Sequence, residues 1–167
     1  MNSVKNKCSN VLALVLLLSS FVPLFFMDRL EGTRVPAHFN FAGIPNKWDN
    51  GTALMVLPFV ACFVYVLLLL SQRWPHMINY PGRRRKGGVT TSSSTDGGSS
   101  KSMEQMHAVG VKYVSRISVV VMLLFSYLAN SSLVIALGYW SKIPSGPMYA
   151  IIGLIVLLTV MFYRDVK

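Results

Sequence analysis

Histidines and acids are the side chains of this sequence that could transfer protons, and they are few: three and six in 167 residues. His38 shares its loop with Asp28, Glu31 and Asp49, and the other two histidines lie beyond the next apolar run. Catalysis needs an acid–base pair and a nucleophile that converge on one substrate, and no segment combines them. A histidine beside an acid in a compact loop is more typical of structural hydrogen bonding. We therefore predict no catalytic residues and a non-enzymatic protein.

Metal binding and disulfide formation are also not indicated. The sequence has no C-x-x-C or H-x-x-H spacing that would suggest a zinc site. Cys8 and Cys62 fall at different depths of two apolar runs, where bridging geometry is not expected. We predict no metal, no cofactor and no disulfide.

Long charge-free runs decide the class of protein. Hydrophobic residues make up 53% of the chain and charged residues 13%, against about 25% in soluble domains. Segments without Asp, Glu, Lys or Arg cover 8–27, 50–72, 117–141 and 143–163. Each has the length that crosses about 30 Å of hydrocarbon as a helix. The sequence predicts an all-α membrane protein with four transmembrane helices. A cleaved signal peptide competes for the first run, but no small-x-small cleavage site follows it.

Basic residues predict the orientation of these helices. The net charge of +10 would suit nucleic acid, but 12 of the 16 Lys and Arg lie in the termini and the loop after the second run. The positive-inside rule then places both termini and that loop in the cytoplasm. We predict a multi-pass protein of the cell (inner) membrane, with no nucleic-acid partner.

The loops divide the chain into three parts. Residues 1–81 form a two-span domain, 82–102 a flexible basic and Ser/Gly-rich cytoplasmic linker, and 103–167 an amphipathic juxtamembrane helix followed by a two-span hairpin. The linker contains Arg83, Arg84, Arg85 and Lys86, which we expect to lie on the anionic cytoplasmic leaflet. A docking site for an acidic protein is the alternative use of this cluster.

The segment 35–51, between the first two spans, predicts an ordered extracytoplasmic cap. It is rich in Pro, Gly and Asn, which argues against a long helix. Aromatic residues alternate with polar ones. In an extended chain His38 and Asn40 would share a side and bond loop backbone, while Phe39, with Phe41 or Trp48, packs on the helix ends. Gly43 would supply a turn that a side chain would hinder.

A family resemblance rests on PAHFN at 36–40, GIP at 43–45 and KW at 47–48. This pattern resembles that of a small bacterial membrane domain of unknown function, also found in the N-terminal part of SdpI-type immunity and signalling proteins. Asn46 departs from it, because the family often has an acid there. The resemblance implies a cap that binds a peptide, toxin or membrane-protein partner. The candidate residues, for binding or for building the cap, are His38, Asn40, Gly43, Pro45 and Trp48.

Asn130 is the most polar residue deep in any predicted span. An amide facing lipid is costly, so we expect it to hydrogen-bond a neighbouring helix. A pathway for ions or solutes is the alternative, although no ionisable group accompanies it. Two functions remain open: a binding, sensing or immunity-like module that uses its cap, and small-solute permeation or transport by a homo-oligomer.

Overall fold

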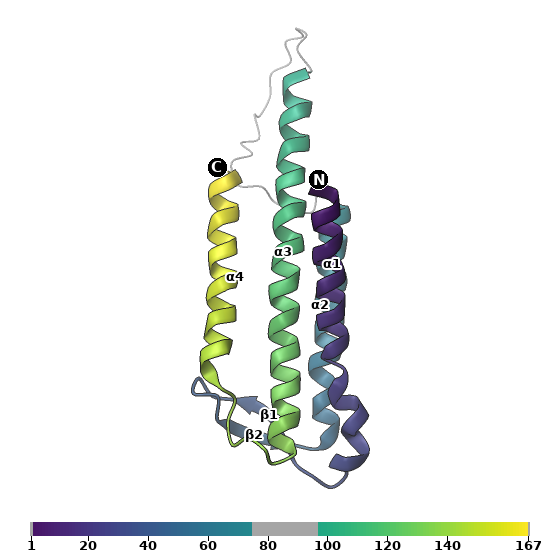
Figure 1. Cartoon of the computed structure of the whole chain (residues 1–167), viewed down its shortest axis with the longest axis vertical. Helices are drawn as coiled ribbons and strands as arrows, with labels where there is room; N and C mark the ends of the chain where they lie inside the picture. Colours follow the sequence, from purple (N-terminus) through teal and green to yellow (C-terminus); the bar gives the residue numbers. More distant parts are fainter. Residues whose placement is uncertain (1, 75–96, 167) are drawn as a thin grey trace, which may run out of the picture.

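The computed structural model describes residues 2–74 and 97–166. Four α-helices run along one another in these residues, and a β-hairpin lies at one end of the bundle (Figure 1). The helices are α1 (Asn2–Ser19), α2 (Val56–Arg73), α3 (Gly97–Ala136) and α4 (Ser145–Val166). Between α1 and α2 the chain forms the 3-10 helices η1 (Val22–Leu30) and η2 (Gly51–Met55) and the strands β1 (Val35–Phe39) and β2 (Pro45–Asp49).

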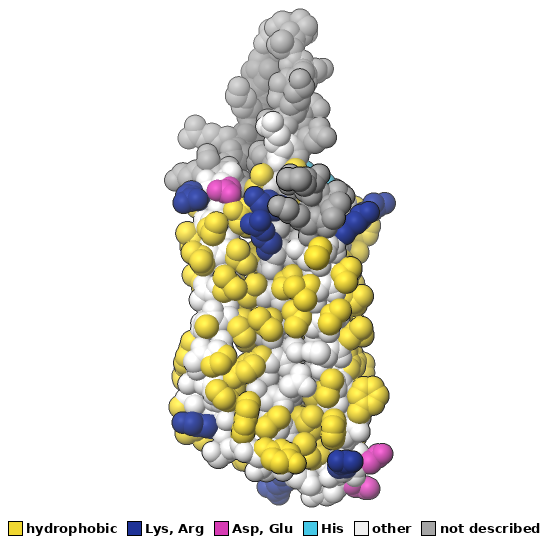
Figure 2. Space-filling view, in the orientation of Figure 1, with side chains coloured by type: hydrophobic (Ala, Val, Ile, Leu, Met, Phe, Trp, Pro, Cys, Tyr) yellow, Lys and Arg dark blue, Asp and Glu magenta, His cyan; other side chains and the backbone are white. Residues whose placement is uncertain are grey.

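Four helical segments are long and apolar enough to cross a membrane, which confirms that part of the sequence prediction. They cover Asn6–Leu30, Gly51–Arg73, His107–Ala136 and Ser145–Asp165. The shortest has 21 residues, about 31 Å at 1.5 Å per residue, close to the thickness of a bilayer's hydrocarbon. Figure 2 shows apolar side chains over the middle of one face, with Lys and Arg near both ends.

The structure differs from the expected all-α chain by its small antiparallel sheet of β1 and β2. The predicted juxtamembrane helix is expected to run into the third span, and the two are continuous. Residues 103–116 are part of the continuous helix α3, which begins at Gly97. No proline interrupts this stretch, so nothing in it forces a helix end. Most of the predicted linker 82–102, including Arg83–Lys86, lies outside the described residues.

Helix α3 is the centre of the bundle. It contacts α1, α2 and α4 along its length, and β1, η1 and η2 at the hairpin end. Mid-bundle, Ala13 of α1 and Ala61 of α2 are buried with Met122 of α3. Small side chains at these positions let the helix backbones approach closely. Nearer the hairpin, Leu30, Val35, Leu54 and Leu133 form a second buried cluster.

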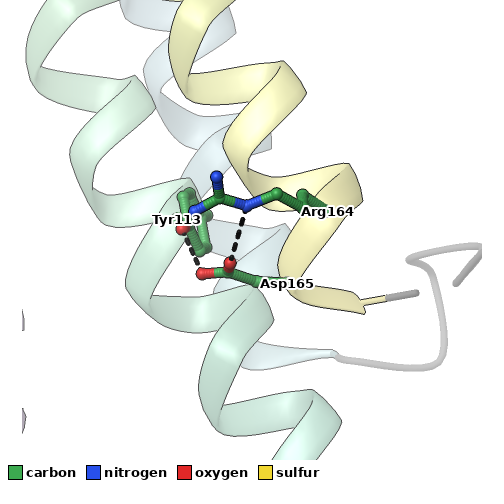
Figure 3. A network of polar contacts seen from close by, with 3 residues as sticks. All are labelled: Tyr113, Arg164 and Asp165. Carbon is green, nitrogen blue, oxygen red and sulfur yellow. Dashed lines mark hydrogen bonds and ion pairs between the residues drawn. The ribbon is translucent and has the colours of Figure 1, made fainter.

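Helix α4 is the least buried of the four and packs chiefly on α3. At the end where both termini lie, the Tyr113 hydroxyl on α3 donates to Asp165 Oδ2 on α4 at 2.5 Å (Figures 1 and 3). Asp165 also lies 3.9 Å from the guanidinium of Arg164. The Tyr113 ring is buried and packs on Phe162, with ring centroids 5.5 Å apart. These contacts join the C-terminal end of α4 to α3.

The first span is bent where α1 gives way to η1. In a continuous helix the Ser19 carbonyl would accept the N–H of residue 23, which is Pro23 and has no N–H. Asn130 Nδ2 donates to that carbonyl instead, at 3.1 Å, and to the Ser126 carbonyl at 2.8 Å. The hydroxyls of Ser19 and Ser126 are themselves 2.5 Å apart. Asn130 thus satisfies a backbone group that the proline leaves open in apolar surroundings.

This arrangement predicts an energetic coupling between Pro23 and Asn130. Asn130→Ala should lower the free energy of unfolding in detergent by about 1–2 kcal/mol, because the Ser19 carbonyl loses its donor. In a Pro23→Ala background, residue 23 regains an N–H that can donate to the Ser19 carbonyl. Asn130→Ala should then lower the free energy of unfolding markedly less. Thermal or denaturant unfolding of the four proteins of this double-mutant cycle measures the coupling. An equal cost of Asn130→Ala in both backgrounds would contradict it.

Candidate functional site

The hairpin is closed by a turn that Asn40 organises. Asn40 Oδ1 accepts the backbone N–H groups of Ala42 and Ile44, each at 3.0 Å. The backbone N–H of Asn40 donates to the Ile44 carbonyl at 3.0 Å, and the backbone carbonyl of Asn40 accepts the Gly43 N–H at 2.9 Å. Asn side chains commonly cap turns in this way. The loop-backbone bonds expected of Asn40 are therefore present, and they fix the path of residues 40–44.

His38 has a different partner from the one expected. Its Nδ1 lies 2.6 Å from Asn46 Oδ1 across the hairpin, a contact in which Nδ1 carries the proton. His38 pairs with Lys47 in the strand register, and Pro45 pairs with Phe39. The sequence analysis missed Asn46 as a member of the site. One sequence feature could have pointed to Asn46: the family that this pattern resembles often has an acid at this position.

The turn is fastened to the loop between α3 and α4. The Ile143 N–H donates to the Gly43 carbonyl at 2.8 Å, and the Tyr149 hydroxyl on α4 donates to the Phe41 carbonyl at 2.5 Å. Gly43 has a φ of +76°, and a Cβ atom there would lie 2.3 Å from the Ile143 carbonyl oxygen. Glycine is therefore required for both conformation and space. No sequence signal had pointed to Ile143 or Tyr149.

The apolar side of the hairpin is not arranged as expected. Val35 and Pro36 are buried and Phe39 is partly buried. Phe41, however, is 88% exposed, and Trp48 is 43% exposed. The sequence predicts that Phe39, with Phe41 or Trp48, packs on the helix ends; Phe39 is partly buried, but neither Phe41 nor Trp48 is. Together with Ile44, which is 47% exposed, these two residues form what we call the apolar rim.

The remaining predicted site residues lie elsewhere. Asn130 is inside the bundle beside Ser19, far along the sequence from the hairpin, and takes no part in the rim. The basic cluster Arg83–Lys86 falls outside the described residues. Within residues 2–74 and 97–166, no three His, Cys, Asp or Glu side chains gather as they would around a metal ion. The hairpin carries all five predicted residues, and Asn46 joins His38, but Trp48 pairs with Pro36, away from the Asn40 turn.

Comparison of this chain with protein-family models, with curated proteins and with solved structures found no match. The site is therefore judged on its own geometry. It consists of a rigid turn, fixed by backbone hydrogen bonds to a distant loop, that holds large apolar side chains in the open. Such a surface suits binding better than chemistry.

Two glycines with the same backbone angle allow the fastening of the turn to be tested. Gly32 also has a φ of +76°, but nothing lies within 4 Å of where its Cβ would be. Gly32→Ala should therefore lower the free energy of unfolding by about 1–2 kcal/mol, the strain of an alanine in the left-handed backbone region. Gly43→Ala should cost at least about 1 kcal/mol more, since the clash also breaks the bond from Ile143.

Thermal unfolding in detergent measures both variants. Limited proteolysis adds a local readout, because residues 40–44 should become more susceptible to cleavage in Gly43→Ala than in Gly32→Ala. Equal losses of stability with equal cleavage would show that the turn is not held by the α3–α4 loop.

Proposed function

We propose that this chain is a multi-pass protein of the cell (inner) membrane whose hairpin is an extracytoplasmic cap. The four apolar helical segments support a membrane location. The excess of Lys and Arg at the end that carries both termini supports a cytoplasmic position for that end. One crossing separates the N-terminus from the hairpin, so the hairpin then lies on the opposite side.

The cap's role is to bind a partner without catalysis, as a sensing or immunity-like module. The single observation that carries this proposal is the exposure of Phe41 on a turn held by six hydrogen bonds, which involve Asn40, Ile143 and Tyr149. A large apolar side chain on a fixed backbone loses little conformational entropy when it is covered. Aromatic residues held in this way are frequent anchors of interfaces. The partner class we assign is a peptide or another membrane protein, in line with the resemblance to SdpI-type proteins.

Permeation through the bundle is less well supported. Three buried serines of the core donate to backbone carbonyls: Ser20 to Leu17, Ser118 to Val114 and Ser132 to Leu128. Asn130 is likewise occupied with backbone oxygens. Polar groups that are satisfied within their own helices serve helix packing rather than a solute path.

The orientation can be tested with single cysteines in a Cys8→Ser, Cys62→Ser background. Lys47→Cys places an exposed thiol on the hairpin, and Gln105→Cys places one on the exposed part of α3 near the termini. A membrane-impermeant maleimide added to intact cells should label position 47 and leave position 105 unlabelled until the cells are lysed. The opposite pattern would refute the orientation.

The binding role can be tested with a photo-crosslinking amino acid at position 41. Phe25 in η1 is a matched control, since it is 84% exposed but lies within an apolar membrane-length segment. Irradiation of cells should give a protein adduct of defined mass from position 41 and lipid adducts from position 25. Phe41→Ser should abolish the phenotype linked to that partner without lowering the melting temperature. Lipid adducts alone from both positions would contradict a recognition role.

A further inference from the structure

A cavity of about 540 Å³ opens at the end of the bundle opposite the hairpin, between α1, α2 and α3. Ten residues line it, and none is acidic: Asn6, Lys7, Asn10, Leu69, Gln72, Arg73, His107, Ala108, Val111 and Lys112. Three of these carry a fixed positive charge and three are amides. The remainder form an apolar wall, apart from one imidazole. A cavity lined by cations and hydrogen-bond donors is suited to an oxyanion.

Two of the three amides of the cavity, those of Asn10 and Gln72, already use their oxygens on one another. Asn10 Nδ2 donates to Gln72 Oε1 at 3.0 Å, and Gln72 Nε2 lies 3.4 Å from Asn10 Oδ1. Gln72 Oε1 also accepts the Ser115 hydroxyl at 3.0 Å. Each amide nitrogen keeps a second hydrogen, so the pair can offer donors, while its acceptors are engaged. This polarity again favours an anion over a cation.

One polar atom of the cavity wall lacks a partner. Among the described residues, His107 Nε2 is the buried side-chain nitrogen or oxygen without a hydrogen bond. Buried polar groups are nearly always paired, so an unpaired one calls for an explanation. Among the described side chains at this end of the bundle, the one carboxylate, Asp165, is engaged by Tyr113 and Arg164. Nε2 is closed off in this conformation, so the imidazole would have to turn toward the cavity for a ligand oxygen to become its partner.

From these observations we infer that the cavity binds a phosphate group. The oxyanion would be held by Lys7, Arg73 and Lys112, with an oxygen accepting from or donating to His107 Nε2. The volume is that of pockets for whole small molecules rather than for a bare ion. Leu69 and Val111 give it an apolar wall, as a phosphate ester with a hydrocarbon part requires. The two sources of such a group are the headgroup of an anionic lipid and a soluble phosphate.

Native mass spectrometry of the full chain in neutral detergent separates these sources. Phosphatidylglycerol should bind saturably, one molecule per chain, and phosphatidylcholine much more weakly. Inorganic phosphate is the second probe: if it competes at millimolar concentration, the site takes free phosphate, and if it does not, the lipid is the ligand. Absence of saturable binding by either probe would overturn the inference.

Matched variants distinguish the cavity from general surface charge. Arg73→Gln and Lys112→Gln should each weaken binding at least about tenfold, because each removes a charge-assisted contact to the phosphate. Lys142→Gln, an exposed cation at the hairpin end, should leave the affinity unchanged. An equal effect of all three variants would show attraction by net charge and would refute a discrete site.

The variant His107→Leu tests whether His107 binds the ligand or only supports the fold, because the two roles predict different changes in melting temperature and lipid affinity. It removes the unpaired nitrogen, so the melting temperature without ligand should stay the same or rise while the lipid affinity falls. A lower melting temperature with unchanged affinity would assign His107 to packing and exclude it from the site.

Discussion

The missing N–H of Pro23 is the constraint on which the arrangement of this bundle depends. A backbone carbonyl in an apolar environment must find a donor, or the folded state loses about 1–3 kcal/mol of stability. The donor for Ser19 comes from Asn130, 111 residues away on α3. This pairing fixes α1 against α3 in depth and rotation. The bend that follows lets η1 turn beneath the bundle and place the start of β1 against Leu133 of α3.

At the hairpin end too, hydrogen bonds join segments that are far apart in the sequence. Turn residues 40–44 form their own hydrogen bonds, but the position of the turn in the molecule is set by Ile143 and Tyr149. The first and second halves of the chain are therefore joined at two places. Inside the bundle Asn130 bonds Ser19, and at the hairpin end Ile143 bonds Gly43. The apolar rim is exposed as a consequence of this fastening, which leaves Phe41 no helix to cover it.

The helices could be read from the sequence because their signal is local. Composition over some twenty residues is enough to indicate a membrane-length segment, and the four segments follow the charge-free runs closely. That Asn130 should bond another helix also followed from its polarity. Its partner could not be predicted, since that depends on where Pro23 lies in space. For the same reason the Tyr149–Phe41 bond, which joins residues 108 apart, left no trace in the sequence. His38 and Asn46 are only eight residues apart, but their pairing requires the irregular strand register.

Helix α4 packs on α3 and is also joined to the rest of the molecule by hydrogen bonds near its two ends. Tyr149, in its first turn, holds the hairpin, and Asp165, in its last, is held by Tyr113. Of the other three α-helices, α3 is the one with which α4 makes substantial contact. One helix therefore connects the hairpin turn directly to the opposite end of the bundle, by contacts that do not pass through α1 or α2.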